Sequence, residues 1–354
     1  MKDYNYVKLY EELKNQIVSG VYAYGDKLPS KRTLAADANV SVITVQHTYA
    51  LLCDEGYVES RERSGYIVIY KESDFLGSTY TNTVPHFEMN NEGVHSKGEI
   101  SYNILAKTMR KVLLDCGDRI LEKSPNAGCL ELRHEIQTHL ARTRDIRIDT
   151  RQIIIGSGAE YLYSLVAQLF DENALIAIEN PSYSKIARVY ESLGHDIDYL
   201  KMGTDGILSS ELKRTKARIL HVTPFHSYPS QVSASISKKK EYITWAGEDG
   251  YIVEDNYDSE LTVSQKMEDA LFLLADGKNV IYINTFSKTV APSLRMGYMI
   301  LPMSLVETFE EKLGFYSCTV PVFEQYVICE LLKNGDFQRH INRVRRKLRK
   351  ASEK

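Results

Sequence analysis

The stretch INTFSKTVAPSLRMGY, residues 283–298, places an amine and a guanidinium close together after an apolar run. Lys288 stands among small and hydroxyl-bearing residues, and Arg295 follows seven residues later. Desolvation and a neighbouring cation both lower the pKa of a lysine, and the neutral amine can then form a Schiff base with an aldehyde. We therefore expect Lys288 to form a covalent bond to a bound group, with the hydroxyls of Thr285 and Ser287 beside it.

An acid and two aromatic residues stand at the ends of other apolar runs. Asp255 closes the run YIVED, and Tyr257 follows two residues later. A carboxylate at the end of a buried strand is costly unless a cation meets it, and a protonated pyridine nitrogen is such a cation. Tyr257 could donate to an oxygen on the same ring, and Tyr183, in ENPSYSK, could lie against its flat face.

A glycine turn that enters a helix supplies a place for a phosphate. In GSGAEYLYSLV, from Gly156 onward, the first N–H groups of the helix would point toward an anion. An amine, an acid, a ring hydroxyl, an aromatic face and a phosphate cradle together predict pyridoxal phosphate. Lys288, Asp255 and Tyr257 are the expected catalytic residues. The expected cofactor-binding residues are Ser157, Gly158, Ala159, Tyr183, Tyr228, Asp255, Tyr257, Thr285, Ser287, Lys288 and Arg295.

The runs that carry these residues predict an α/β domain. Short runs that are apolar on both faces alternate with helical stretches, which is typical of a mostly parallel sheet covered by helices on both sides. Ligands in such sheets bind beyond the carboxyl ends of the strands. The expected strands are residues 152–156, 174–179, 218–223, 251–255, 280–286 and 297–302.

The first seventy residues predict a separate small domain. Apolar residues at helical spacing give a first helix that ends near Gly20, Ser30 can cap a second helix and Ser41 a third. The runs YVESR and YIVIY then form a hairpin around Gly65. Three helices and a hairpin predict a winged helix-turn-helix, whose third helix enters the major groove of DNA.

Residues 38–53, which include most of the third helix, contain no Asp or Glu, so they can approach DNA. Residues 1–70 hold eight Lys or Arg against nine Asp or Glu, a net charge of -1, so affinity must come from a local patch and from two copies. The expected DNA-binding residues are Lys31, Arg32, Ser41, Thr44, Gln46, His47, Arg61 and Arg63.

Length and composition are those of a soluble globular protein. The 354 residues are 43% hydrophobic and 26% charged, and no apolar run approaches the ~20 residues of a membrane span. The start lacks the apolar stretch of a signal peptide, so we expect a cytoplasmic protein. The five cysteines form no CxxC pair and no cluster with histidine, which predicts reduced packing thiols and no metal site. The expected domains are 1–70, a polar linker 71–98, and 99–354.

The last segment, from residue 336, predicts an amphipathic helix with seven Lys or Arg between Arg339 and Lys350. We expect its basic face to be solvated or to meet acidic residues, with contact to the DNA backbone as the alternative.

The motifs resemble two known families. The run YGDKLPSKRTLAADANVSVITVQHTYALLCDEGYVESRERSGYIV is similar to the winged helix of GntR-family regulators, although Val42 stands where that family usually has an arginine. The base-reading contact therefore stays unassigned. Residues 100–354 are similar to the large domain of fold-type I aminotransferases, with GSGAE, ENPSY, TPFHSYPSQ, VEDNYDSEL and TFSKTVAPSLRMGY in that family's order.

The two parts together resemble the MocR type of regulator. This resemblance implies a head-to-tail homodimer that binds pyridoxal phosphate, an operator with direct-repeat half-sites, and an amino acid or amine effector. Tyr228 stands where aminotransferases have the asparagine that contacts the ring oxygen. Aminotransferases continue with a small C-terminal domain, and we expect that domain to be absent or truncated in this sequence.

The resulting hypothesis is a transcription regulator that senses an effector through a Schiff base at Lys288. An active aminotransferase that carries a DNA-binding module is the alternative, because the same lysine and aspartate serve both. A regulator with a vestigial pocket is a third interpretation, which the intact set of Asp255, Tyr257, Lys288 and Arg295 disfavours.

Overall fold

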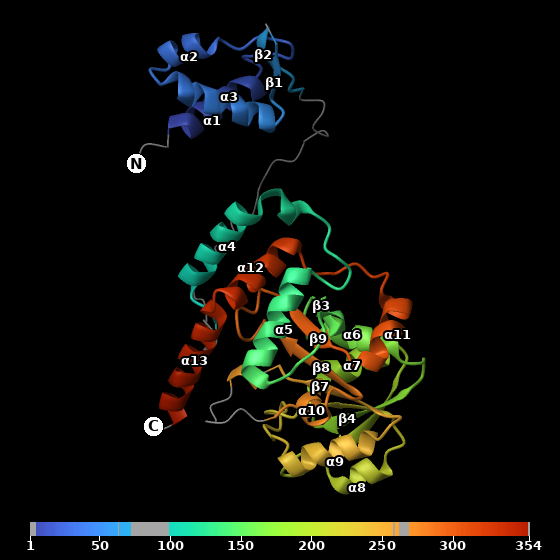
Figure 1. Ribbon diagram of the computed structural model, residues 1–354. Helices are drawn as coiled ribbons and strands as arrows, with labels where there is room; N and C mark the ends of the chain where they lie inside the picture. The colour runs from blue at the N-terminus through green and yellow to red at the C-terminus, as the bar shows by residue number, and fades with distance from the viewer. Residues whose placement is uncertain (1–4, 63, 72–98, 258, 262–268, 353–354) are drawn as a thin grey trace. The chain divides into compact units, whose positions relative to one another are not determined.

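The computed structural model describes residues 5–62, 64–71, 99–257, 259–261 and 269–352 (Figure 1). The chain divides into two compact units, one N-terminal and one C-terminal. The predicted linker falls almost entirely outside the described residues. Within the described ranges, every helix is too short or too polar to cross a lipid bilayer.

The described part of the N-terminal unit is a winged helix-turn-helix. Its elements are α1 (Asn5–Val18), α2 (Lys31–Asp37), α3 (Val42–Asp54), β1 (Val58–Arg61) and β2 (Gly65–Val68). The predicted caps are confirmed, since Ser30 accepts a hydrogen bond from Thr33 N at 3.1 Å and Ser41 accepts one from Thr44 N at 3.0 Å. Tyr49 and Leu52 of α3 are fully buried in the small core that holds the three helices together.

The C-terminal unit is built on a seven-stranded sheet, as far as the described residues show, in the order β3-β9-β8-β7-β6-β4-β5. The strands from β8 to β5 pair in parallel, whereas β9 is antiparallel to both β3 and β8. The mostly parallel sheet predicted from the sequence is confirmed. The strands are β3 (Ile153–Gly156), β4 (Leu175–Asn180), β5 (Asp196–Lys201), β6 (Ile219–Val222), β7 (Tyr251–Asp255), β8 (Val280–Thr285) and β9 (Gly297–Ile300).

Helices cover both faces of this sheet, because its central strands are apolar on both sides. Successive residues of one strand enter different cores: Tyr282 belongs to one and Ile283 to the other. The first face packs against α4 (Tyr102–Cys116), α5 (Leu130–Arg144), α8 (Ser209–Arg214), α9 (Ile236–Ala246), α10 (Leu271–Leu274), α12 (Val322–Lys333) and α13 (Asp336–Ser352). The second packs against α6 (Ala159–Leu169), α7 (Ser184–Ser192) and α11 (Met303–Leu313). Short 3-10 turns are η2 (Gly117–Leu121), η3 (Thr150–Gln152) and η4 (Ser259–Leu261).

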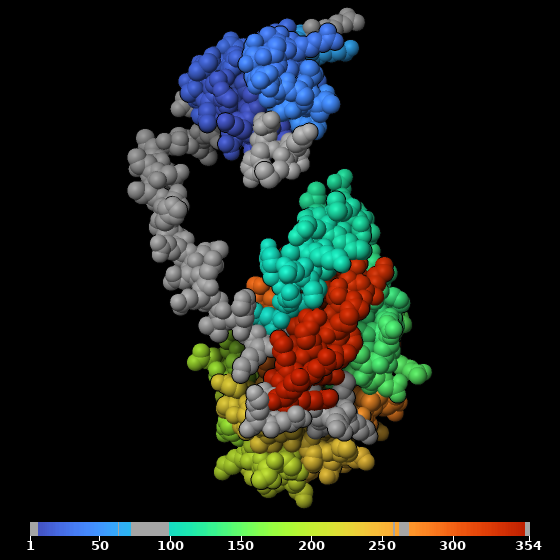
Figure 2. Space-filling model, turned by 90° about the vertical axis from the view of Figure 1, so that its left-hand side faces the viewer, coloured from blue at the N-terminus to red at the C-terminus, as the bar shows by residue number. Residues whose placement is uncertain are grey.

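The predicted C-terminal helix is α13, which lies on the outer surface of the C-terminal unit beside α4 and α5 (Figure 2). Its apolar residues Phe337, Ile341 and Val344 are buried in the core. Arg345 donates from Nε to the backbone oxygen of Glu260 at 2.7 Å, so part of the basic face meets an acidic residue of the same unit.

Strand β5 was not predicted from the sequence. Its residues are exposed or partly buried except for the buried Leu200, and it forms the edge of the sheet next to β4. Edge strands carry charged side chains that discourage further pairing, and Asp196 and Asp198 are such residues. A search for runs that are apolar on both faces therefore passes over it.

Candidate functional site

A pocket of about 380 Å³ lies where the carboxyl ends of the parallel strands meet. Gly156, Thr285 and Gly297 stand side by side at this edge, because β9 pairs Gly297 with both of the others. The strand ends thus bring together residues that are far apart in the sequence, as predicted. The lining residues are Ala159, Glu160, Tyr163, Tyr183, Thr223, Tyr228, Asp255, Tyr257, Thr285, Ser287, Lys288 and Arg295.

Asp255 is the buried acid of this pocket. It ends β7, is 3% exposed, and accepts hydrogen bonds from the Tyr163 hydroxyl and from Tyr257 N, the latter at 3.2 Å. Burial raises the pKa of its carboxyl to about 6, and the two hydrogen bonds act in the opposite direction. The carboxylate is therefore held in a place where a cationic ring nitrogen would stabilise its charge.

Tyr163 is a pocket residue that was not predicted from the sequence. It is fully buried on α6, and its ring also packs edge-on against His221 at 5.0 Å between centroids. Its position four residues after Ala159 puts both on one face of the helix, which is the only sequence signal that it shares the pocket.

Lys288 lines the pocket beside Tyr257. Its Nζ is 4.6 Å from the centroid of the Tyr257 ring, so the amine and this ring are neighbours. The expected desolvation of the amine is wrong, because Lys288 is exposed in this chain. The hydroxyl of Tyr257 donates to the backbone oxygen of His226 at 3.1 Å, which orients the ring.

The glycine turn before α6 forms a narrow cradle. Gly158 has a φ of +94°, and a Cβ there would lie 3.1 Å from a terminal guanidinium nitrogen of Arg295. The side chain of Arg295 thus crosses directly over the turn. A glycine is needed both for the left-handed backbone and for this close approach.

Two of the predicted phosphate donors already have partners in the chain. The N–H of Ser157 donates to Thr319 Oγ1 at 3.2 Å, and the hydroxyl of Ser287 donates to Leu294 O at 3.0 Å. Among the predicted groups, the start of α6 at Ala159 and the guanidinium of Arg295 are the donors best placed at the cradle.

Glu160, the second residue of α6, was also missed. Its carboxylate accepts from Arg295 at 2.6 Å and from Lys185 Nζ at 2.8 Å. Burial acts to raise the pKa of Glu160, but the hydrogen bond from Lys185 and the charge of Arg295 hold it below its ordinary value. An ionised carboxylate therefore occupies the predicted phosphate cradle.

Aromatic and hydroxyl groups complete the walls. Tyr183 and Tyr228 face each other edge-on with ring centroids 6.4 Å apart, and Tyr228 is 55% exposed at the rim. Thr285 is buried at the end of β8, and Thr223, which the sequence analysis did not single out, lies near the end of β6. The loop before Tyr228 is braced by Ser227, whose hydroxyl donates to the buried Glu179 at 2.5 Å.

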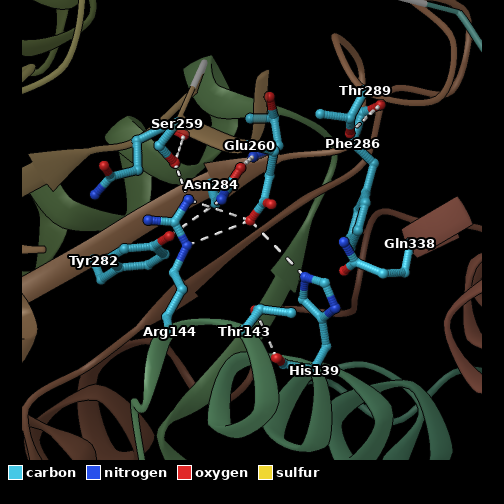
Figure 3. Close-up of polar contacts among 12 residues, drawn as sticks. His139, Thr143, Arg144, Ser259, Glu260, Tyr282, Asn284, Phe286, Thr289 and Gln338 are labelled. Atoms are coloured by element: carbon cyan, nitrogen blue, oxygen red, sulfur yellow. Dashed lines mark hydrogen bonds and ion pairs between the residues drawn. The ribbon is translucent and has the colours of Figure 1, made fainter. Parts of the chain in front are cut away.

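A buried ion-pair network fixes the segment that follows Asp255 and Tyr257 (Figure 3). Arg144, at the end of α5, donates to Ser259 Oγ at 2.5 Å and to Glu260 Oε1 at 3.3 Å. His139 Nε2 lies 3.8 Å from the same oxygen. Burial opposes the charge of Glu260, but Arg144 overcomes this effect and holds the pKa of the carboxyl well below its usual range. The network ties η4 to α5 on one side and to Arg345 of α13 on the other.

The predicted DNA-binding residues lie on the surface of the N-terminal unit. Gln46 and His47 are exposed on the face of α3 that also carries Ile43, and Arg32 is exposed on α2. The Ser41 and Thr44 hydroxyls are 2.8 Å apart in the cap of α3.

The flanking cations are partly engaged: Lys31 Nζ is 5.6 Å from the centroid of the Tyr66 ring, and Arg61 Nε donates to Glu59 at 2.8 Å. Arg63 falls outside the described residues. Val42 and Ile43 were not among the predicted DNA-binding residues. They are 44% and 67% exposed at the start of α3, where apolar groups could contact thymine methyls.

Two families match the chain. Residues 5–68 match the family described as bacterial regulatory proteins, gntR family, and residues 96–354 match aminotransferase class I and II. Among solved structures, the chain is similar to LysN, an α-aminoadipate aminotransferase from Thermus thermophilus, with a TM-score of 0.62 and 26% identity over 72% of this chain and 68% of that one. It shares the fold of an archaeal alanine:glyoxylate aminotransferase, with a TM-score of 0.63 and 24% identity, over 68% of this chain and 62% of that chain.

The full two-part arrangement recurs in bacterial regulators. The chain is 32% identical to the HTH-type transcriptional regulator YdeL of Bacillus subtilis over 98% of its own length and 77% of the relative's. It is 28% identical to the pyridoxine biosynthesis regulator PdxR of Corynebacterium glutamicum and 26% identical to the probable rhizopine catabolism regulatory protein MocR of Rhizobium meliloti, covering 96% of this chain in both cases, and 75% and 74% of those proteins. The chain therefore belongs to the MocR-type subfamily of GntR-family transcription regulators, in which a winged helix-turn-helix is joined to an aminotransferase-like domain.

Proposed function

We propose that the protein regulates transcription by binding operator DNA through α3 and by sensing an amine through pyridoxal phosphate held at Lys288. The observation that carries this proposal is the pocket in which a buried carboxylate, an amine, a guanidinium and an aromatic face meet. Tyr183, Asp255 and the loop that carries both Lys288 and Arg295 belong to three separate segments, and all four residues line the pocket.

The residues present fit this cofactor. The buried Asp255 suits the protonated ring nitrogen, Tyr183 suits the face of the ring, and the cradle of Gly158 under Arg295 suits the phosphate. When bound, pyridoxal phosphate supplies an aldehyde that reacts with amines and a pyridine ring that withdraws electrons.

Each side chain then has a defined task. Asp255 keeps the proton on the ring nitrogen, and the Tyr163 hydroxyl supports the charged form of Asp255 by donating to it. Lys288 supplies the amine, and Tyr257 packs beside it. An amine effector that displaces Lys288 would change DNA binding only if it binds one of two arrangements of the protein more tightly than the other. Two arrangements of a homodimer are the simplest case.

The experiment that tests the cofactor is borohydride reduction after incubation with pyridoxal phosphate, followed by peptide mapping. We expect a single pyridoxyl label on Lys288. Lys111 is the matched control, because its amine pairs with Asp115 at 2.8 Å and it does not line the pocket. The variant Lys288→Met should lose the label and Lys111→Met should keep it. A label anywhere but Lys288, or none at all, would refute the proposal.

A second measurement separates the regulator from an active aminotransferase. Gel shifts on the upstream promoter, with and without candidate amines, are compared with the rate of amino-acid half-transamination. We expect DNA binding that an amine alters and slow or absent turnover. Fast turnover without DNA binding would favour the enzyme instead.

A further inference from the structure

The predicted phosphate cradle contains an acid as well as its cations. Glu160 is the second residue of α6, so its carboxylate lies at the helix end where an anion is most favoured. Its two oxygens accept from different cations, Oε1 from Lys185 at 2.8 Å and Oε2 from Arg295 at 2.6 Å. The carboxylate therefore bridges Arg295, which an incoming phosphate would use, and the neighbouring cation Lys185.

The net charge of the cradle determines how strongly it would attract a phosphate. Arg295 and Lys185 contribute two positive charges and Glu160 removes one. A phosphate monoester carries close to two negative charges at neutral pH, so it would meet a site with half of the matching charge. It would also meet a like charge at short range, since Glu160 is only 27% exposed and its repulsion is incompletely screened.

The position of Arg295 leaves little room for both anions. Its guanidinium lies over Gly158, where an added Cβ would be 3.1 Å away from a terminal nitrogen and 3.3 Å away from Cζ. The guanidinium therefore lies close over the helix start, and the same terminal nitrogen that lies nearest to Gly158 donates to Glu160. A phosphate at the helix start has to share or replace that contact.

We propose that Glu160 competes with the phosphate of the cofactor: its carboxylate binds Arg295 and Lys185, and this contact lowers the affinity for pyridoxal phosphate. This inference rests on the proposed function. Because Glu160 weakens cofactor binding, the site fills at a higher concentration of pyridoxal phosphate than it would if only the cations were present.

The opposite role for Glu160 predicts the opposite result. If the carboxylate only holds Arg295 in place for the phosphate, its removal weakens binding. If it competes, its removal tightens binding. The isosteric variant Glu160→Gln separates the two, because it removes the charge and keeps the size of the side chain.

The experiment is a titration of the full-length protein with pyridoxal phosphate, followed by absorbance, for the wild type and Glu160→Gln. We expect the variant to bind pyridoxal phosphate about three- to tenfold more tightly, because a partly exposed charged contact contributes a free energy of this size. Pyridoxal, which lacks the phosphate, is the ligand control and should bind both proteins equally. Glu211→Gln is the protein control, because Glu211 makes a comparable contact to Arg214 at 3.0 Å, away from the pocket.

A double-variant comparison tests whether the effect passes through Arg295. In an Arg295→Gln background, Glu160→Gln should change the affinity by less than half as much, on a logarithmic scale, as it does in the wild type. Unchanged or weaker binding of pyridoxal phosphate by Glu160→Gln overturns the inference and leaves the proposed function standing. An equal gain for pyridoxal also overturns it. Failure of both the wild type and Glu160→Gln to bind overturns the proposed function as well.

Discussion

Removal of Arg144 should destabilise the C-terminal unit far more than removal of an exposed arginine. Arg144 is 8% exposed, and the variant Arg144→Met leaves the 5% exposed Glu260 without its nearest guanidinium. Breaking a buried pair from one side costs about 3–5 kcal/mol, because the remaining charge stays desolvated. For a domain of this size, this corresponds to a fall of about 6–20 °C in the midpoint of thermal unfolding.

Urea unfolding monitored by circular dichroism measures the loss, and Arg147→Met is the matched control. Arg147 is close in the sequence and pairs with Asp145 at 3.6 Å, but both side chains are more than three-quarters exposed. Its replacement should change the free energy of unfolding by less than about 0.5 kcal/mol. The double variant Arg144→Met/Glu260→Met should recover most of the loss, because two apolar side chains leave no buried charge.

The same pair gives the wild type an acid-sensitive component. Because the folded pKa of Glu260 is depressed, its stabilisation is complete above the ordinary carboxyl pKa and declines as the pH falls below about 4. Arg144→Met should lose most of this dependence, because Arg144 lowers the pKa of Glu260 more than His139 and Arg345 do. A cost below about 1 kcal/mol for Arg144→Met, or a double variant no more stable than the sum of the single losses, would refute the reasoning.

Three further predictions concern the pocket. Gly158→Ala should cost about 1–3 kcal/mol in unfolding measurements and weaken the binding of pyridoxal phosphate, because Gly158 has a φ of +94° and the new Cβ would press on Arg295. Tyr163→Phe should weaken that binding about tenfold in a titration at pH 7, since Asp255 loses a hydrogen bond to its charged form. Burial raises the pKa of Glu179 to about 8, so the folded protein keeps a proton that the unfolded chain releases. The free energy of unfolding should therefore fall by at most about 1.4 kcal/mol per pH unit between about pH 5 and 8. Glu179→Gln should flatten this slope in urea unfolding curves recorded across that range, and an unchanged slope would assign the titration to another group.

The ends of the parallel strands were the most predictable part of the site. Asp255, Thr285 and Lys288 could be placed together from the sequence, because apolar runs reveal the strands and parallel strands end at one edge. Tyr183 and Arg295 follow from the same reasoning. The winged helix could be predicted equally well, because Ser30 and Ser41 cap helices through the hydrogen bonds that their hydroxyls accept.

The contacts between segments were not predictable. The N–H of Ser157 donates a hydrogen bond to Thr319, which lies 162 residues away in the chain, and no local sequence pattern predicts such a partner. The roles of Glu160 and Tyr163 depend on how α6 is rotated above the sheet, which is decided by packing. The exposure of Lys288 likewise depends on what covers the pocket mouth and cannot be read from its small neighbours.

The antiparallel strand β9 makes the amine and the guanidinium parts of one closed loop. The loop leaves the sheet at Thr285 and returns at Gly297, and these two residues are paired across β8 and β9. Both anchors are fixed, so an insertion or deletion between them changes the spacing of Lys288 and Arg295 while the strands stay in register. A lineage could therefore abolish cofactor chemistry through a short length change here and still inherit an intact scaffold.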